Sequence, residues 1–200
     1  MNGREVPDTM MNQIESKPVD RARLVEIIKA RSFQVGGETK LASGRTSSFY
    51  FNMKPTMLDP EGGYLIGALV LDLIADEGAT MIGGLEMGAV PLATAVATVS
   101  HMRGQPLPAF FVRKQAKEHG TQAMVEGLPN GQTLAGHRIV VVEDVTTTGG
   151  SALKAVESIK STGGEVLAVV TLVDRDEGAV ATFAEAGIAF KPLLTVRDFA

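Results

Sequence analysis

The feature that most constrains the fold is the apolar run Ile139–Val142, which is followed at once by the acids Glu143 and Asp144. Four consecutive β-branched residues predict a strand that is buried on both faces. Strands of this kind occur in parallel sheets that helices cover on both sides. The rest of the chain alternates similar runs with helical segments, so we expect an α/β fold in which helices flank a parallel sheet.

The chain of 200 residues is long enough for one sizeable domain, expected over 18–200, with a small appendage. Residues 1–17 are polar and aperiodic and are expected to form a flexible tail. A small N-terminal unit, mainly 18–60, should contain a helix at 18–31 and a hairpin with strands at 38–42 and 48–53. The core should run over 62–200, with helices at 64–77, 91–101, 151–161 and 179–186 and strands at 79–84, 107–113, 138–144, 166–173 and 189–196.

The segment that follows the buried strand combines two carboxylates with a loop rich in hydroxyl groups and glycine. Carboxylates accept hydrogen bonds from the vicinal hydroxyls of a ribose. The loop then opens into a predicted helix, whose free backbone N–H groups and dipole favour a phosphate. We therefore expect a ribose 5-phosphate to bind at Glu143, Asp144, Val145, Thr146, Thr147, Thr148, Gly149, Gly150 and Ser151.

A simpler interpretation of this segment is a strand, a turn and a helix that is capped by Thr148 or Ser151. Capping explains one hydroxyl group, but not two adjacent acids, three threonines and two glycines together. Two other phosphate-binding patterns are excluded, because the sequence contains neither Gly-x4-Gly-Lys-Ser/Thr nor Gly-x-Gly-x-x-Gly.

A cluster of positive charge begins where the strand predicted at 107–113 ends. Arg113, Lys114, Lys117 and His119 fall within seven positions at the start of a long irregular stretch, and we expect a mobile loop over 114–136. Mobile cations stabilise the charge that develops on a phosphate leaving group, and a closing loop excludes water. The alternatives are a solvated charged loop or a basic patch for nucleic acid, and the formal net charge of −4 argues against the latter.

Two motifs resemble those of one group of enzymes. Residues 139–151 resemble the motif that binds phosphoribosyl pyrophosphate (PRPP) in type I phosphoribosyltransferases. The pattern Arg-Lys-x-x-Lys-x-His-Gly at 113–120 resembles the catalytic loop of orotate phosphoribosyltransferases. The resemblance extends over most of the chain and implies a type I phosphoribosyltransferase-like parallel sheet with a small N-terminal hood and a long mobile catalytic loop.

The resemblance implies that the phosphoribosyl group of PRPP is transferred to orotate, which gives orotidine 5-phosphate and pyrophosphate in UMP synthesis. It implies that Lys117 contacts the pyrophosphate as the main catalytic loop residue, and that Arg113, Lys114 and His119 bind PRPP. Asp144 completes the implied catalytic set. The loop of this family reaches into the neighbouring subunit's site, so a homodimer is implied as well.

The N-terminal hairpin resembles the hood strand that covers orotate in this family. Tyr50 and Phe51 match the family's aromatic residues, and either ring could instead belong to the core. Ala42 and Met87 stand where lysines are common in the family, and Lys54 is a candidate for a substitute cation.

Thr147 and Arg175 match the remaining positions that contact orotate in this family. Arg175 follows a predicted strand, and an arginine at a strand end is well placed to pair with a substrate carboxylate. The alternative for Arg175 is a surface ion pair with Asp174 or Asp176.

Magnesium is expected to arrive with the pyrophosphate, since the sequence contains no pattern for a protein-only metal site, and His101 and His137 lack ligand spacing. The chain has no cysteine and no apolar window long enough for a membrane span. We therefore expect a cytoplasmic protein without a membrane or nucleic-acid partner. Two alternatives stay open, a phosphoribosyltransferase for another base and a non-catalytic PRPP-sensing regulator.

Overall fold

The computed structural model describes residues 20–40, 46–115 and 124–200. Its centre is a sheet with the strand order β5-β4-β3-β6-β7-β8, in which β5 is antiparallel to β4 and all other neighbours are parallel. The predicted α/β fold with a parallel sheet is therefore confirmed. The strands are β3 (Met81–Leu85), β4 (Ala109–Val112), β5 (Val125–Glu126), β6 (Arg138–Thr146), β7 (Glu165–Asp174) and β8 (Ala189–Thr195).

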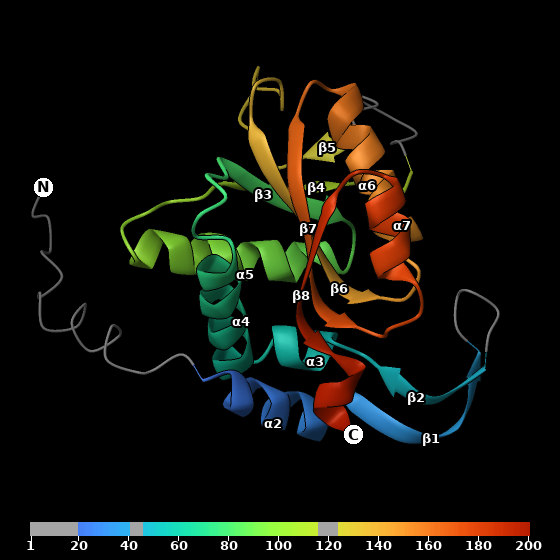
Figure 1. Ribbon diagram of the computed structural model, residues 1–200. Helices are drawn as coiled ribbons and strands as arrows, with labels where there is room; N and C mark the ends of the chain where they lie inside the picture. Colours follow the sequence, from blue (N-terminus) through green and yellow to red (C-terminus); the bar gives the residue numbers. More distant parts are fainter. Residues whose placement is uncertain (1–19, 41–45, 116–123) are drawn as a thin grey trace, which may run out of the picture.

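Helices cover both faces of this sheet (Figure 1). One face packs against α4 (Pro60–Leu73) and α5 (Ala89–Met102), and the other packs against α6 (Gly150–Ser161) and α7 (Ala179–Glu185). None of the described helices is both long enough and apolar enough to span a membrane.

The central strand β6 explains why the sheet needs two helical layers. Val140 and Val142 point into the core on the side of α4 and α5, whereas Ile139 and Val141 pack with α6 and Phe183 of α7. All four side chains are at most 1% exposed. Because successive side chains of a strand point to opposite faces, an unbroken β-branched run requires cover on both.

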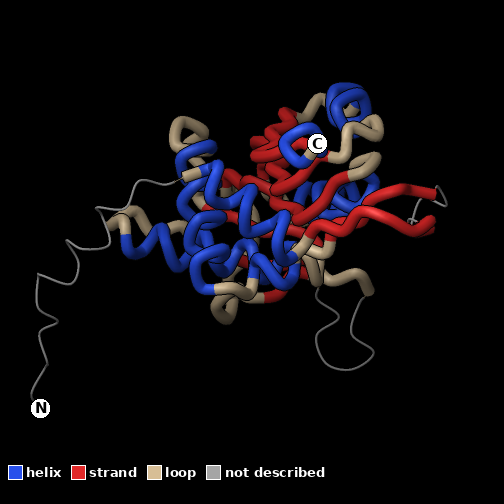
Figure 2. Tube along the Cα trace, turned by 90° about the horizontal axis from the view of Figure 1, so that it is seen from below, coloured by secondary structure: helices blue, strands red, loops and turns tan. Residues whose placement is uncertain are grey.

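The N-terminal hood is a separate two-stranded antiparallel sheet of β1 (Phe33–Lys40) and β2 (Thr46–Phe51). Figure 2 shows this hairpin projecting from the body of the molecule. Its base is fixed by an aromatic cluster of Phe33, Phe49, Phe51 and Phe199, whose rings lie 4.9–6.2 Å apart. Phe199 belongs to the C-terminal 3-10 helix η1 (Val196–Phe199), so the two ends of the described chain meet here.

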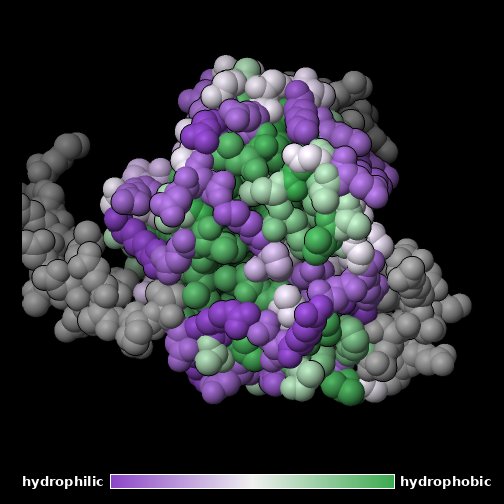
Figure 3. All heavy atoms as spheres, viewed as in Figure 1, coloured by the Kyte–Doolittle hydropathy of each residue, from purple (hydrophilic) through white to green (hydrophobic). Residues whose placement is uncertain are grey.

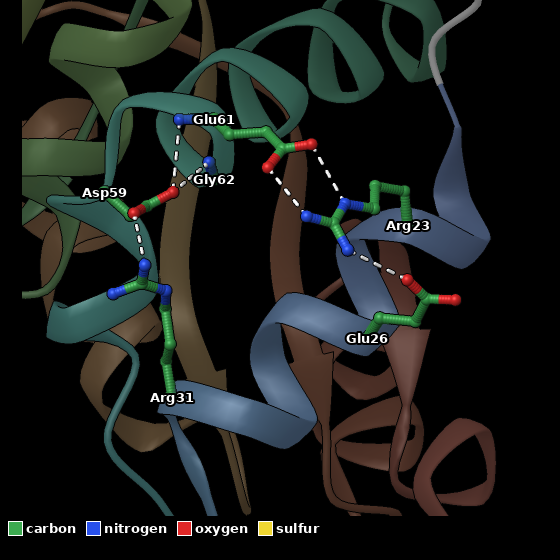
Figure 4. A network of polar contacts seen from close by, with 6 residues as sticks. All are labelled: Arg23, Glu26, Arg31, Asp59, Glu61 and Gly62. Carbon is green, nitrogen blue, oxygen red and sulfur yellow. Dashed lines mark hydrogen bonds and ion pairs between the residues drawn. The ribbon is translucent and has the colours of Figure 1, made fainter.

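A polar network fastens the first described helix, α2 (Arg21–Arg31), to the start of α4 (Figure 4). Arg23 donates to both carboxylate oxygens of Glu61 at 2.9 Å, and Arg31 pairs with Asp59 at 2.9 Å. Asp59 also accepts hydrogen bonds from the N–H groups of Glu61 and Gly62 and so caps α4. These contacts hold α2 against the start of α4.

Several elements differ from the prediction, and β1 begins at Phe33, five residues before the predicted start of its strand. Helix α4 begins at Pro60, four residues before the predicted start, because Asp59 is its cap and Gly62 packs against the Thr56 carbonyl instead of breaking the helix. The short helix α3 (Lys54–Met57) and strand β5 were not predicted. The prediction of a wholly irregular segment over 114–136 is therefore wrong for its described part, in which β5 pairs with β4 and Leu134 is 1% exposed.

The surface is not uniformly polar. Figure 3 shows hydrophobic residues at the surface in the centre of the face seen in Figure 1 and hydrophilic residues around its margins. Among the described residues, Leu58 and Met87 are large apolar side chains that are 72% and 58% exposed.

Candidate active site

The two acids lie near the carboxyl end of β6, at the edge of the sheet where ligands bind in parallel α/β folds. Glu143 and Asp144 are both half-buried rather than enclosed in the core. Burial raises the pKa of Glu143 to about 7, with a smaller contribution from the charge of Asp144. Burial also raises the pKa of Asp144. Two partly desolvated carboxylates side by side are stabilised by a ligand that brings hydroxyl groups or positive charge.

The loop after the acids leads directly into α6. Gly149 is the N-cap residue with a φ of 88°, and the cap has no side-chain hydrogen bond, so neither Thr148 nor Ser151 caps this helix. The interpretation of the segment as an ordinary capped helix is therefore wrong. The first N–H groups of α6 are available to an anion, and the helix dipole favours negative charge there.

Close packing against Phe183 of α7 fixes this loop. A Cβ on Gly149 would lie 2.9 Å from the ring of Phe183, which itself stacks on Phe190 at 4.7 Å. Glycine is thus required both by the left-handed backbone and by the aromatic ring beneath it. The arrangement positions Thr147 and Thr148, which are half-buried and exposed, at the front of the loop.

A second loop, Leu85–Gly88, lies beside the acids. A Cβ on Gly88 would meet the carboxylate of Asp144, with 2.7 Å between it and the carboxyl carbon. The peptide bond between Glu86 and Met87 is cis. Glu86 accepts a hydrogen bond of 2.9 Å from the N–H group of Lys114, and this contact joins the loop to the end of β4.

The start of the basic loop is held beside this edge of the sheet. Arg113 donates its backbone N–H group to Met124 at 2.8 Å, and its guanidinium lies 3.7 Å from Glu126. The charge of Lys114 lowers the pKa of both acids against the effect of burial. Lys114 is thus brought toward the acids, and Arg113 precedes it beside Glu126 of β5, whereas Lys117 and His119 lie outside the described residues.

Arg175 follows the carboxyl end of β7, at the same edge of the sheet as the acids. Its N–H group donates to the carbonyl of Thr146 at 3.0 Å, which brings it next to Thr147. The side chain is buried, pairs with Glu177 at 2.9 Å and lies 4.6 Å from the ring of Phe49. The alternative of a surface ion pair is wrong, since the side chain of Arg175 is buried and pairs with Glu177, while Asp176 pairs with Arg197.

The two predicted aromatics do not share one face of β2. Phe51 is 5% exposed within the aromatic cluster, whereas Tyr50 is 40% exposed on the opposite side of the strand. Phe49, two positions before Phe51, lies on the same face and contacts Arg175. Sequence reasoning missed Phe49, although the period of a strand relates it to Phe51. Ala42 lies outside the described residues.

The acid pair meets part of what a magnesium ion requires. Glu143 and Asp144 offer carboxylate oxygens, which this ion prefers. In 20–40, 46–115 and 124–200 there is no group of three or more acidic, histidine or cysteine side chains that could enclose a metal. The residues present therefore fit an ion that keeps several of its ligands from water or from a bound diphosphate.

Comparison with known proteins places this geometry in a family. Residues 59–186 match the family described as "Phosphoribosyl transferase domain". The chain is 59% identical to the orotate phosphoribosyltransferase of Bradyrhizobium sp. strain BTAi1 over 184 residues, which cover 92% of this chain and 99% of the relative. It is 41% identical to the enzyme of the same name from Aquifex aeolicus over 90% of this chain and 97% of the relative.

Solved structures of orotate phosphoribosyltransferases also resemble this chain. The orotate phosphoribosyltransferase of Mycobacterium tuberculosis in complex with Fe(III) dicitrate is 40% identical, with a TM-score of 0.78 over 92% of this chain and 99% of that chain. The same enzyme in complex with PRPP is 37% identical, with a TM-score of 0.73 over 90% of this chain and 98% of that chain. These identities extend over nearly the whole chain and over nearly the whole of each relative. The chain therefore belongs to the orotate phosphoribosyltransferase family.

Proposed function

We propose that this chain transfers the phosphoribosyl group of PRPP to orotate and releases pyrophosphate and orotidine 5-phosphate. The observation that carries the proposal is the position of Glu143 and Asp144 directly before the uncapped N-terminus of α6. This order supports a ribose whose hydroxyls face the acids and whose 5-phosphate faces the loop 147–151. Arg175, beside Thr147 and paired with Glu177, would hold the carboxylate of orotate by exchanging part of that ion pair for the substrate.

Catalysis in this proposal depends on charge and orientation more than on proton transfer. As pyrophosphate leaves, positive charge develops on the sugar, and negative charge grows on the leaving group. The acids hold the sugar and face its developing positive charge. Arg113 and Lys114, at the end of β4, face the departing diphosphate, and Lys117 and His119 join them by the family resemblance.

Magnesium bound to the diphosphate would neutralise part of the charge of the leaving group. The acid pair is the part of this chain that suits such a complex, through its own oxygens or through water. The specific ion is a proposal that rests on the donor types alone.

We also propose that the chain acts as a homodimer whose basic loops cross into the neighbouring sites. In support, a hollow of about 730 Å³ runs along α3, α4 and α5 and is lined mainly by apolar side chains. Met87 connects this hollow to the loop beside Asp144, and the exposed Leu58 lies along it. A second copy on this face would cover the apolar surface and bring its loop to the site. A cytoplasmic location stays a prediction from the sequence.

The function is tested by supplying PRPP and magnesium with one base at a time and measuring pyrophosphate release. We expect release with orotate, together with orotidine 5-phosphate in equal amount, and little release with uracil, adenine or hypoxanthine. A preference for one of the other bases would replace orotate as the substrate. Tight PRPP binding without turnover of any base would indicate a regulator rather than an enzyme.

A further inference from the structure

Lys54, the candidate for a substitute cation, lies at the edge of the site. It is the first residue of α3 and follows the hood strand β2 after only two residues. Its side chain is exposed, and its ammonium takes part in none of the hydrogen bonds or ion pairs found among the described residues. The helix that carries it is fixed, because Thr56 is buried and its hydroxyl lies 2.7 Å from that of Ser32.

The surroundings of Lys54 connect it to the acids. Lys54 and Met87 line the same hollow, and the next residue, Gly88, lies against the carboxylate of Asp144. The charge of Lys54 lowers the pKa of Asp144, against the effect of burial. Lys54 therefore acts on Asp144 from the side of α3, while Lys114 acts on both acids from the end of β4.

Among the described residues, the arginines at this edge already have acidic neighbours. The guanidinium of Arg113 lies near Glu126, and that of Arg175 is paired with Glu177. The loop Leu85–Gly88 carries an acid and no cation. A diphosphate placed between this loop and the acid pair would meet two half-buried negative charges and would require positive charge from a neighbouring element.

We propose that Lys54 binds the diphosphate of PRPP, and the released pyrophosphate, from the α3 side of the site, where the loop Leu85–Gly88 supplies no cation. The inference rests on the proposed phosphoribosyl transfer. An ammonium on a flexible stem suits a phosphate group, because it is a compact charge with three donors and needs no fixed plane. Lys54 is thus a substrate-binding residue of this chain, and it supplies the positive charge that Met87 does not.

The test uses Lys54→Ala and Lys54→Arg in the full chain, with Lys160→Ala as a matched control. Lys160 is also an exposed lysine, but it lies at the C-terminal end of α6, away from the acids. For Lys54→Ala we expect KM for PRPP, and KM for pyrophosphate in the reverse reaction, to rise roughly tenfold. KM for orotate should stay within about twofold, Lys54→Arg should recover most of the loss, and Lys160→Ala should match the wild type.

Unchanged KM values for PRPP and pyrophosphate in Lys54→Ala would overturn the inference. So would an effect confined to orotate, which would assign Lys54 to the base instead. If the wild-type chain released no orotidine 5-phosphate, the proposed function would fail first. Calorimetric binding of magnesium pyrophosphate to the wild type and to Lys54→Ala would then still decide the role of Lys54, since equal affinities would reject it.

Discussion

At the scale of single residues, the acid pair carries a cost in stability that the ligand-binding role explains. The pKa of Glu143 is raised from 4.5 to about 7 by burial and by its neighbour Asp144. A carboxyl whose pKa is higher in the folded state holds more protons there than in the unfolded chain between these two values. Stability is therefore lost as the pH rises from about 4.5 to about 7. Such a cost in stability is typical of residues that serve binding rather than folding.

Glu143→Gln should remove this cost. We expect the free energy of unfolding at about pH 8 to increase by roughly 1–3 kcal/mol relative to the wild type, with little difference near pH 4. Urea unfolding at the two pH values measures the effect. The same variant should bind PRPP more weakly, because an amide is a poorer acceptor for a ribose diol than a carboxylate. Equal unfolding free energies at both pH values would mean that burial does not raise the pKa of Glu143.

The proposed role of Arg175 in binding orotate depends on the planar shape of its guanidinium as well as on its charge. Its guanidinium pairs with Glu177 and lies over Phe49, and lysine cannot reproduce a planar group held between two partners. For Arg175→Lys we expect KM for orotate to rise roughly tenfold, with KM for PRPP nearly unchanged. Arg197→Lys is the matched control, because Arg197 also pairs with an acid but is 81% exposed. A normal KM for orotate in Arg175→Lys would separate Arg175 from the base.

At the scale of elements, the junction between β6 and α6 was predictable from local sequence. The run Ile139–Val142 can be satisfied only by a buried strand, and Gly149 marks a left-handed turn before a helix. Strand β5 could not be predicted, because two residues have no periodicity and pair only once β4 is present. The contact between Phe49 and Arg175 joins two distant parts of the chain, and neither local pattern contains it.

Gly149→Ala should test how firmly this junction positions the phosphate loop. Alanine would have to adopt a φ of 88° and would also press its Cβ against Phe183. We expect a loss of about 2–4 kcal/mol in unfolding free energy, from backbone strain and overpacking together. PRPP affinity, measured by calorimetry on folded protein, should fall as well.

Gly136→Ala is the control for backbone strain alone. Gly136 has a φ of 76°, but a Cβ there would meet no atom within 4 Å. This variant should lose only about 1–2 kcal/mol, the cost of the left-handed backbone, and should bind PRPP normally. If the two variants were equally stable and bound PRPP equally, the packing of Gly149 against Phe183 would not be what holds the loop.

At the scale of the whole molecule, the described chain supplies only part of the proposed site. The acids, the loop before α6 and Arg175 come together at one edge of the sheet, beside an apolar hollow that reaches Met87. In the proposed homodimer, a neighbouring subunit seated on that hollow delivers its own basic loop. The site of that proposal belongs to a pair of chains, and its two halves can be inactivated separately.

Complementation between two defective chains tests this arrangement. Lys117→Ala alone should lower kcat roughly 10²–10³-fold, and Asp144→Asn alone should weaken PRPP binding in its own subunit. If the loop crosses between subunits, a mixed dimer of these two variants has one site with both defects and one site with neither. Random pairing of the two chains in equal amounts should then restore about a quarter of wild-type activity.

The tagged variants would be co-expressed and the mixed species isolated, with each variant alone as its control. If each loop served its own subunit, every site in the mixture would keep a defect and no activity would return. A chain that sediments as a monomer while remaining fully active would exclude both arrangements of a dimer. Each variant chain carries one defect, so a site built from a single chain is always defective. Recovery of activity is therefore possible only if a site takes its residues from two chains.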